Sequence, residues 1–166
     1  MLQKKAITIE NAMTRAASLC ARCEQCSPDI IKKLTNWGLS ADGIHKVMSE
    51  LKRLRFLDDE RFVKAYAHDK LHFSGWGKRK ITQGLWAKRL PKNIIELAFD
   101  EIEDDEYEAI AVKVIKSKIP HIKEGLWSYD GKMKLLRFGV QRGFEVALIA
   151  AIIKRIAAGM KNNDEE

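Results

Sequence analysis

Prolines, cysteines and long apolar runs are all scarce in this sequence of 166 residues. There are three cysteines, and an odd number without a secretion signal argues against a disulfide scaffold. The longest apolar run, from Val146 to Ile153, has eight residues, whereas a membrane-spanning helix needs about 20. Residues 1–10 lack the apolar segment that a signal peptide requires. We therefore expect a cytoplasmic protein with reduced thiols and no membrane partner.

Charge, in contrast, is abundant and unevenly distributed. Lys and Arg number 30 against 23 Asp and Glu, so the net charge is +7. Residues 1–92 have a net charge of +10, and residues 93–166 have a net charge of −3. Residues 78–92 contain six bases and no acids, whereas residues 96–108 contain eight acids and no Lys or Arg. A basic region of this kind indicates either a solvated helix surface or a surface for nucleic acid or an acidic protein.

Apolar residues recur with the spacing of α-helices almost throughout the chain. Spacings of three and four residues are typical of a helix with one buried face. No segment alternates between apolar and polar residues in the manner of a β-strand. Together with capping residues such as Ser40 and Asp58, the pattern predicts nine helices. They span residues 9–25, 28–37, 41–54, 58–73, 77–89, 92–102, 104–118, 130–139 and 144–157.

The nine predicted helices form three groups of three. In each group the second helix ends with Leu and an aliphatic residue five positions later, at separations of 51 and 50 residues. The matching pairs are Leu34 and Leu39, Leu85 and Leu90, and Leu135 and Val140. The first helices of the second and third groups both begin with Asp-Asp-Glu, at 58–60 and 104–106. A period of about 50 residues falls in the range of helical repeat arrays.

We therefore predict an all-α fold of three tandem three-helix repeats, each similar to a helix-turn-helix unit, stacked into an elongated, curved body. The repeats are expected at residues 1–56, 57–103 and 104–160. A loop insertion is expected at 119–130 in the third repeat, and a polar tail at 161–166.

Two clusters contain residue types that bind metals. Cys20, Cys23 and Cys26 form a C-x-x-C-x-x-C pattern, but zinc and iron–sulfur sites need four ligands and the chain has no fourth cysteine. His68 and His72 lie one turn apart on a predicted helix without an evident third ligand. We expect three free thiols and a solvated or partner-facing histidine pair. A metal or redox sensor built on the three cysteines is kept as an alternative hypothesis.

Residues 76–80, Trp-Gly-Lys-Arg-Lys, open a predicted helix, and a helix N-terminus with flanking bases can bind an anion. No G-x-x-x-x-G-K-[ST] motif follows, so a nucleotide-binding loop is not supported. Trp76 and Trp86 can stack on nucleic-acid bases, although tryptophans in a small helical protein are expected in the core. No catalytic triad or carboxylate pair is evident, and we do not expect an enzyme.

Several longer motifs occur in a specific order. They are Leu34-x-x-Trp37-Gly38-Leu39-Ser40, Phe56-Leu57-Asp58-Asp59-Glu60-Arg61-Phe62, Trp76-Gly77-Lys78-x-Lys80-Ile81 and Leu135-Leu136-x-Phe138-x-x-x-Arg142-Gly143-Phe144. In order and spacing they resemble the RecX family, regulators of the RecA recombinase, along nearly the whole chain. The resemblance implies binding in the groove of the RecA filament on DNA. It also implies suppression of the ATPase, strand-exchange and co-protease activities of RecA, and thereby regulation of DNA repair and the SOS response, without a catalytic site or cofactor.

One turn departs from the family pattern. The second repeat of the family turns at Lys-Gly-Ile, whereas this chain has Lys88-Arg89-Leu90. Arg adopts a left-handed conformation at a higher cost than Gly. Either this turn is built differently or its backbone is strained.

The charge distribution predicts a concave basic face that meets the RecA–DNA filament. Its predicted residues are Arg53, Arg55, Arg61, Lys78, Arg79, Lys80, Lys88 and Arg89. We expect a monomer, with DNA itself as a second partner. The alternative is a sequence-specific DNA-binding protein, in which residues 30–51 form a helix-turn-helix with Gly38 in the turn.

Overall fold

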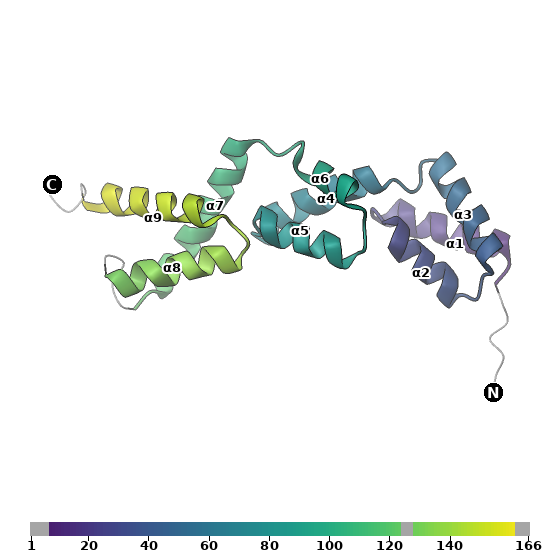
Figure 1. Cartoon of the computed structure of the whole chain (residues 1–166), viewed down its shortest axis with the longest axis horizontal. Helices are drawn as coiled ribbons and strands as arrows, with labels where there is room; N and C mark the ends of the chain where they lie inside the picture. Colours follow the sequence, from purple (N-terminus) through teal and green to yellow (C-terminus); the bar gives the residue numbers. More distant parts are fainter. Residues whose placement is uncertain (1–6, 124–127, 162–166) are drawn as a thin grey trace, which may run out of the picture. The chain divides into compact units, whose positions relative to one another are not determined.

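The computed structural model describes residues 7–123 and 128–161, and every regular element within them is helical (Figure 1). The α-helices are α1 (Ile9–Arg22), α2 (Ser27–Asn36), α3 (Ala41–Arg53), α4 (Asp59–His72), α5 (Lys78–Ala87), α6 (Lys92–Glu96), α7 (Asp104–Lys118), α8 (Tyr129–Gln141) and α9 (Val146–Lys161). Two short 3-10 helices, η1 (Leu97–Phe99) and η2 (Ile119–His121), follow α6 and α7. The prediction of an all-α fold is confirmed.

Three helices are shorter than predicted by three residues or more: the first, α5, which spans Lys78–Ala87 rather than 77–89, and the helix predicted at 92–102. The first ends at Arg22 because Cys23 is extended, with φ −160° and ψ 156°, and leads the chain towards α2. The predicted helix 92–102 is divided into α6 and η1 and ends at Phe99. The predicted loop at 119–130 lies partly outside the described residues, as does most of the predicted tail at 161–166.

The chain folds into two compact units, which are described separately below. The first comprises the residues up to Ala65 together with Leu85–Ala98, and the second comprises Tyr66–Gly84 together with the residues from Phe99 onward. The three boundaries fall inside α4, α5 and η1, so residues of the predicted second repeat contribute to each unit. The division into three repeats at residues 56 and 103 stays a prediction.

In the first unit, α1, α2 and α3 pack around one apolar core. Its buried residues are Ala12, Ala16, Ile30, Leu34, Val47, Met48, Leu51 and Leu57. Ala12 and Ala16 have no exposed surface, and their small side chains allow the neighbouring helices to approach α1 closely. Ser40 caps α3 as predicted, because its Oγ accepts a hydrogen bond from the Gly43 N–H at 3.2 Å.

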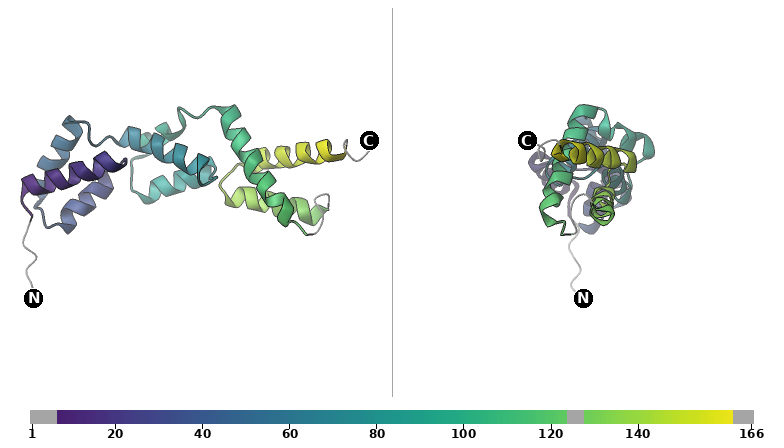
Figure 2. Two further views of the ribbon diagram at one scale, coloured as in Figure 1. Left: turned by 180° about the vertical axis from the view of Figure 1, so that it is seen from behind. Right: turned by 90° about the vertical axis from the view of Figure 1, so that its left-hand side faces the viewer.

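In the second unit, α7 packs against both α8 and α9, which lie side by side (Figures 1 and 2). Phe144, in the connection between α8 and α9, is fully buried, and its ring centroid lies 5.4 Å from that of Tyr107 on α7. Ile115 of α7 and Ile149 of α9 are also fully buried. The helices of this unit therefore bury aromatic and aliphatic side chains between them.

A left-handed residue follows α2, α5 and α8 in turn. These residues are Gly38 (φ 85°), Arg89 (φ 61°) and Gly143 (φ 95°), at separations of 51 and 54 residues. At Arg89 the chain therefore makes this left-handed turn without a glycine. The backbone is strained there, which is the second of the two outcomes expected from the sequence. A left-handed conformation costs a residue with a side chain about 1–2 kcal/mol.

The third repeat is out of register with the sequence match by four residues. The Leu39 N–H donates to the Leu34 carbonyl at 3.2 Å, and the Phe144 N–H donates to the Gly139 carbonyl at 3.2 Å. Gly139, rather than Leu135, is therefore the structural counterpart of Leu34, and the predicted match at Leu135 is wrong. A shift of four residues is close to one helical turn, so Leu135 remains buried on the same face.

Arg89→Gly is expected to raise the free energy of unfolding by about 0.5–1 kcal/mol, because it relieves the left-handed strain while adding chain entropy to the unfolded state. Urea denaturation followed by circular dichroism measures the change. Gln83→Gly, at an exposed position in the interior of α5, is the matched control and is expected to lose about 1 kcal/mol. Loss of stability in Arg89→Gly would contradict the strain at this turn.

Candidate functional site

Five of the eight predicted surface bases belong to the first unit. They are Arg53, Arg55, Arg61, Lys88 and Arg89. Arg53 ends α3 and pairs with Glu50 of the same helix at 2.7 Å, while its side chain stays 67% exposed. Arg55 and Arg89 are exposed and both occupy left-handed turns, with φ 58° and 61°. These three side chains are accessible to a partner.

Arg61 holds the chain that precedes it. Its Nε donates to Glu24 Oε1 at 2.6 Å, and its terminal nitrogens donate to the carbonyls of Arg55 and Phe56 at 3.3 and 3.4 Å. One guanidinium thus fixes the turn between α3 and α4 and ties it to the end of α1. An Arg fork suits this task because its donors lie in one rigid plane.

Lys88 is also engaged within the unit. Its Nζ lies 2.6 Å from Asp29 Oδ2 and 5.5 Å from the centre of the Phe62 ring. Partial burial acts to raise the pKa of Asp29, but the hydrogen bonds and positive charge of its neighbours, with Lys88 foremost, lower it overall. This contact joins the end of α5 to the first turn of α2.

The Leu-Asp-Asp-Glu-Arg-Phe motif, residues 57–62, connects helices of the first unit. Asp58 Oδ1 accepts from the Arg61 N–H at 3.1 Å and caps α4, as predicted. Asp59 Oδ1 accepts from the Ser27 N–H, the first N–H of α2, at 2.6 Å. The carboxylates of this motif therefore occupy two helix N-termini, where negative charge is favoured.

The remaining three predicted bases begin α5 in the second unit, next to a close backbone contact. The Gly77 N–H donates to the Arg142 carbonyl at 2.8 Å, and the Arg79 N–H donates to the Gly143 carbonyl at 3.1 Å. A Cβ on Gly77 would lie 2.4 Å from the Gly143 carbonyl. We call this contact between residues 77–79 and 142–143 the glycine joint. Because its carbonyls accept from those N–H groups, they are not available to an anion, and the anion site considered for this helix N-terminus does not form there.

Tyr107 adds a third bond to the beginning of α5. Its hydroxyl accepts from the Lys78 N–H at 3.0 Å and donates to Glu145 Oε2 at 2.8 Å. Burial and the neighbouring carboxylate raise the pKa of Tyr107. The Lys78 side chain lies over the Tyr107 ring, 4.6 Å from its centre, and 3.7 Å from Asp104. The positive charge of Lys78 is therefore partly neutralised, unlike the charges of Arg79 and Lys80.

Bases and aromatic rings alternate around Trp76. Lys70 Nζ lies 4.9 Å and Lys80 Nζ 4.7 Å from the centre of the Trp76 ring, and Lys70 is also 5.5 Å from the Tyr66 ring. Arg79 is exposed, and among the described residues its guanidinium forms no ion pair. Lys70 was not among the predicted surface bases, because it stands apart from the basic run at 78–80.

The two tryptophans of the basic region differ in burial. Trp76 is half-buried, whereas Trp86 is 56% exposed on α5 in the first unit. The expectation that both belong to the core is wrong for Trp86. Leu85, the residue before it, is fully buried and takes the inward position on α5.

The two histidines of α4 lie close to each other and to carboxylate groups. The rings of His68 and His72 are 4.3 Å apart, His72 Nε2 lies 2.9 Å from Glu106 Oε1, and both residues are exposed. Within residues 7–123 and 128–161, no group of three or more His, Cys, Asp or Glu side chains has the arrangement to hold a metal ion.

The three cysteines are free thiols in different surroundings. Cys23 is exposed, Cys20 is half-buried and Cys26 is fully buried at the N-terminus of α2. Burial raises the pKa of Cys26 from 9.0 to about 11. The neutral thiol is thus favoured in the folded state. Its contribution to stability is complete below pH 9 and is lost as the pH rises through about 11.

Alkylation by iodoacetamide at pH 8 is expected to modify Cys23 at least about 100-fold faster than Cys26, since only the accessible thiolate reacts. Peptide mass spectrometry at successive times measures both rates in the same sample. The same reaction in concentrated urea is the control, in which the two rates should converge. Equal rates in the folded protein would contradict the burial of Cys26.

In the part of the chain that the structure describes, no helix has both the length and the apolar character needed to cross a bilayer.

Comparisons with known proteins agree on one family. A family model described as the second three-helix domain of RecX matches residues 58–98. Regulatory protein RecX of Finegoldia magna is 32% identical over 117 residues, which cover 70% of this chain and 57% of that protein. Regulatory protein RecX of Legionella pneumophila strain Corby is 28% identical over 145 residues, covering 87% of this chain and 94% of that protein.

Solved structures share the fold. The crystal structure of RecX from Lactobacillus salivarius matches with a TM-score of 0.80 at 19% identity, covering 90% of this chain and 97% of that one. A second crystal structure, of a regulatory protein RecX, matches with a TM-score of 0.72 at 16% identity and covers 87% of this chain and 72% of that one.

Proposed function

Because this chain belongs to the RecX family of regulatory proteins, we propose that it is a non-enzymatic modulator of the RecA recombinase. It binds in the groove of the RecA–DNA filament and inhibits ATP hydrolysis, strand exchange and co-protease activity, and thereby regulates DNA repair and the SOS response. The observation that supports this most is the similarity to the Legionella pneumophila protein, which extends over 87% of this chain. In this proposal the protein acts in the cytoplasm as a monomer without a cofactor, and it contacts both RecA and DNA.

The predicted basic face divides into two kinds of residue in this proposal. Arg79 and Lys80, with Lys70 beside them, are the bases of the second unit that meet the filament. Two observations support this assignment. Arg79 is exposed, and the Nζ atoms of Lys80 and Lys70 lie 4.7 and 4.9 Å from the centre of the Trp76 ring. Phosphate groups and acidic side chains both favour such a surface.

In the first unit, Arg53, Arg55 and Arg89 are the proposed contacts, while Arg61 and Lys88 hold the fold. Arg61 and Lys88 already have partners at 2.6 Å within the unit. Binding an outside anion would require those bonds to break, which reduces the gain in free energy. Their loss would therefore affect stability before it affects recognition.

The test is ATP hydrolysis by a RecA filament on single-stranded DNA, with and without this protein. The double variant Arg79→Glu/Lys80→Glu is expected to need a concentration about tenfold higher or more for half-inhibition, because it replaces attraction with repulsion. Lys113→Glu, an exposed charge reversal on α7, is the matched control and should inhibit like the unmodified protein. Failure of the unmodified protein to inhibit RecA would overturn the proposed function.

A measurement of DNA binding distinguishes the helix-turn-helix alternative. The turn between α2 and α3 has Gly38 at φ 85°, so its geometry does not exclude that function. Binding to selected and random duplexes is compared at one salt concentration. A ratio of about a thousand or more would favour sequence-specific DNA binding over filament regulation.

A further inference from the structure

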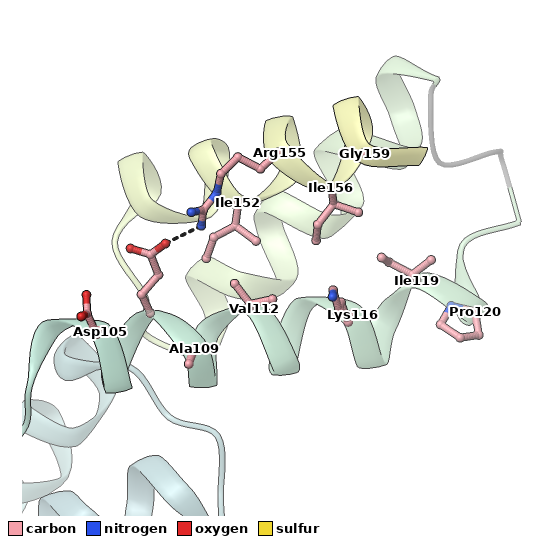
Figure 3. Close-up of a pocket in the computed structure, with 11 residues that line it drawn as sticks. Asp105, Ala109, Val112, Lys116, Ile119, Pro120, Ile152, Arg155, Ile156 and Gly159 are labelled. Carbon is pink, nitrogen blue, oxygen red and sulfur yellow. Dashed lines mark hydrogen bonds and ion pairs between the residues drawn. The ribbon is translucent and has the colours of Figure 1, made fainter. Parts of the chain in front are cut away.

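An open groove separates α7 from α9 in the second unit (Figure 3). It has a volume of about 790 Å³, within the range of about 300–1,000 Å³ that is typical of binding pockets. Its floor and walls are mainly aliphatic, from Ala109, Val112, Ile119, Ile152 and Ile156. The proposed RecA-facing bases do not line it.

The polar side chains of the groove are arranged along its length. Glu108 and Arg155 pair with each other across it, so neither charge is left for a ligand. Asp105 and Lys116 remain, and both are exposed. They stand eleven positions apart on α7, about 16 Å along the helix axis. The groove thus has an acidic end, an apolar middle and a basic end.

The two helices that border the groove run in the same direction. In Figure 3, Ile152, Ile156 and Gly159 of α9 succeed one another alongside Ala109, Val112 and Ile119 of α7. Both helix dipoles therefore point the same way, with their negative ends near Lys116. A third helix laid in the groove is favoured when it runs antiparallel to them.

We propose that this groove binds an amphipathic helix from a partner protein. The bound helix runs antiparallel to α7, with acidic residues in its first turn beside Lys116 and basic residues in its last turn beside Asp105. Acids at the N-terminus and bases at the C-terminus also stabilise the isolated helix. Apolar residues at spacings of three and four fill the middle of the groove, as in other complexes of a helix with a groove.

The length of the groove sets the size of the partner segment. Residues 105–120 line one wall, and about 15 residues of helix extend over roughly 22 Å. This length presents three or four apolar anchors on one face. The identity of the partner is open, but its recognition segment is a helix of four or five turns.

The test uses two synthetic helical peptides of 18 residues. Both contain the same row of Leu anchors and the same hydrocarbon staple on the opposite face, so their helicity is equal. One has Glu in its first turn and Lys in its last turn, and the other has these charges exchanged. Fluorescence anisotropy with the full chain should show at least about tenfold tighter binding of the first peptide.

Two variants locate the binding. Ala109→Glu places a charge in the apolar middle and should weaken binding at least about tenfold, whereas Ala151→Glu, exposed on α9 outside the groove, should leave it unchanged. Lys116→Glu should abolish the preference for the first peptide. Circular dichroism checks folding, and Lys116→Glu serves as the deciding variant if Ala109→Glu does not fold.

Several outcomes overturn the proposal. They are lack of saturable binding of either peptide, equal binding of both by the unmodified protein, unchanged binding in Ala109→Glu, and an unchanged preference in Lys116→Glu. Sedimentation that reveals a dimer, lost in Ala109→Glu, assigns the groove to a second copy instead. The proposal is independent of RecA, because peptide binding should be intact in Arg79→Glu/Lys80→Glu, whose inhibition of RecA is expected to be impaired.

Discussion

Gly77→Ala is expected to lower the free energy of unfolding by about 3–5 kcal/mol, the largest effect predicted for this protein. The added Cβ would lie 2.4 Å from the Gly143 carbonyl and from the Phe144 nitrogen. These are backbone atoms, so relief requires the helix connections to separate and the bonds at 2.8 and 3.1 Å to break. Overpacking costs about 1–3 kcal/mol and each lost hydrogen bond about 1 kcal/mol.

Urea denaturation followed by circular dichroism measures this effect. Gly159→Ala is the matched control, because a Cβ at that position of α9 has no other atom within 4 Å. It should stabilise the protein by up to about 1 kcal/mol, the difference in helix propensity between Gly and Ala. Similar unfolding curves for the two variants would show that the glycine joint does not hold the second unit together.

Arg61→Ala is expected to destabilise the protein by about 2 kcal/mol, whereas Arg53→Ala should change stability by less than about 0.5 kcal/mol. Both residues were predicted on the same basic face. Arg61 donates hydrogen bonds to Glu24 and to two carbonyls of the preceding turn. Without this side chain those carbonyls lose their protein donor, and the left-handed turn at Arg55 is no longer held in place. Arg53 forms only a pair within α3, and its side chain is 67% exposed.

The unfolding midpoints in urea test this pair, and RecA inhibition is measured at a temperature where both variants are folded. Arg61→Lys is a further control, which keeps the charge but loses the planar fork. If stability in Arg61→Lys matched the unmodified protein, the charge alone would account for the role of Arg61. If Arg61→Ala were as stable as Arg53→Ala, the structural role would be refuted.

The helices were predictable because their signals are local. Ser40 and Asp58 cap their helices as the sequence indicates. The end of the first helix was missed because Cys23 and its neighbours have no glycine or proline to mark it. The register of the third repeat was missed for a different reason. Leu135 and Gly139 lie one turn apart on the same face, so apolar periodicity cannot distinguish them.

The basic residues were also predictable, but their roles were not. Arg61 finds Glu24 across 37 positions, and Lys88 finds Asp29 across 59 positions. Ion pairs of this kind form only when the tertiary packing brings two distant helices together. The residues near each base in the sequence carry no information about that packing. The count of bases therefore overstated the accessible charge. Lys70 of α4, which lies over the Trp76 ring in the connection to α5, was not among the predicted surface bases.

The left-handed turn at the end of α8 has a consequence for how this helix can vary in length. An insertion of four residues advances the left-handed turn by about 6 Å along the helix axis but rotates it by only about 40°. The same flank of the helix would stay inward, so the residues of the turn would still face Gly77 and Arg79, which in this chain donate to the carbonyls of Arg142 and Gly143 at 2.8 and 3.1 Å. Insertions or deletions of one or two residues would turn that flank outward. Natural length changes in this helix should therefore occur in steps of three, four or seven residues.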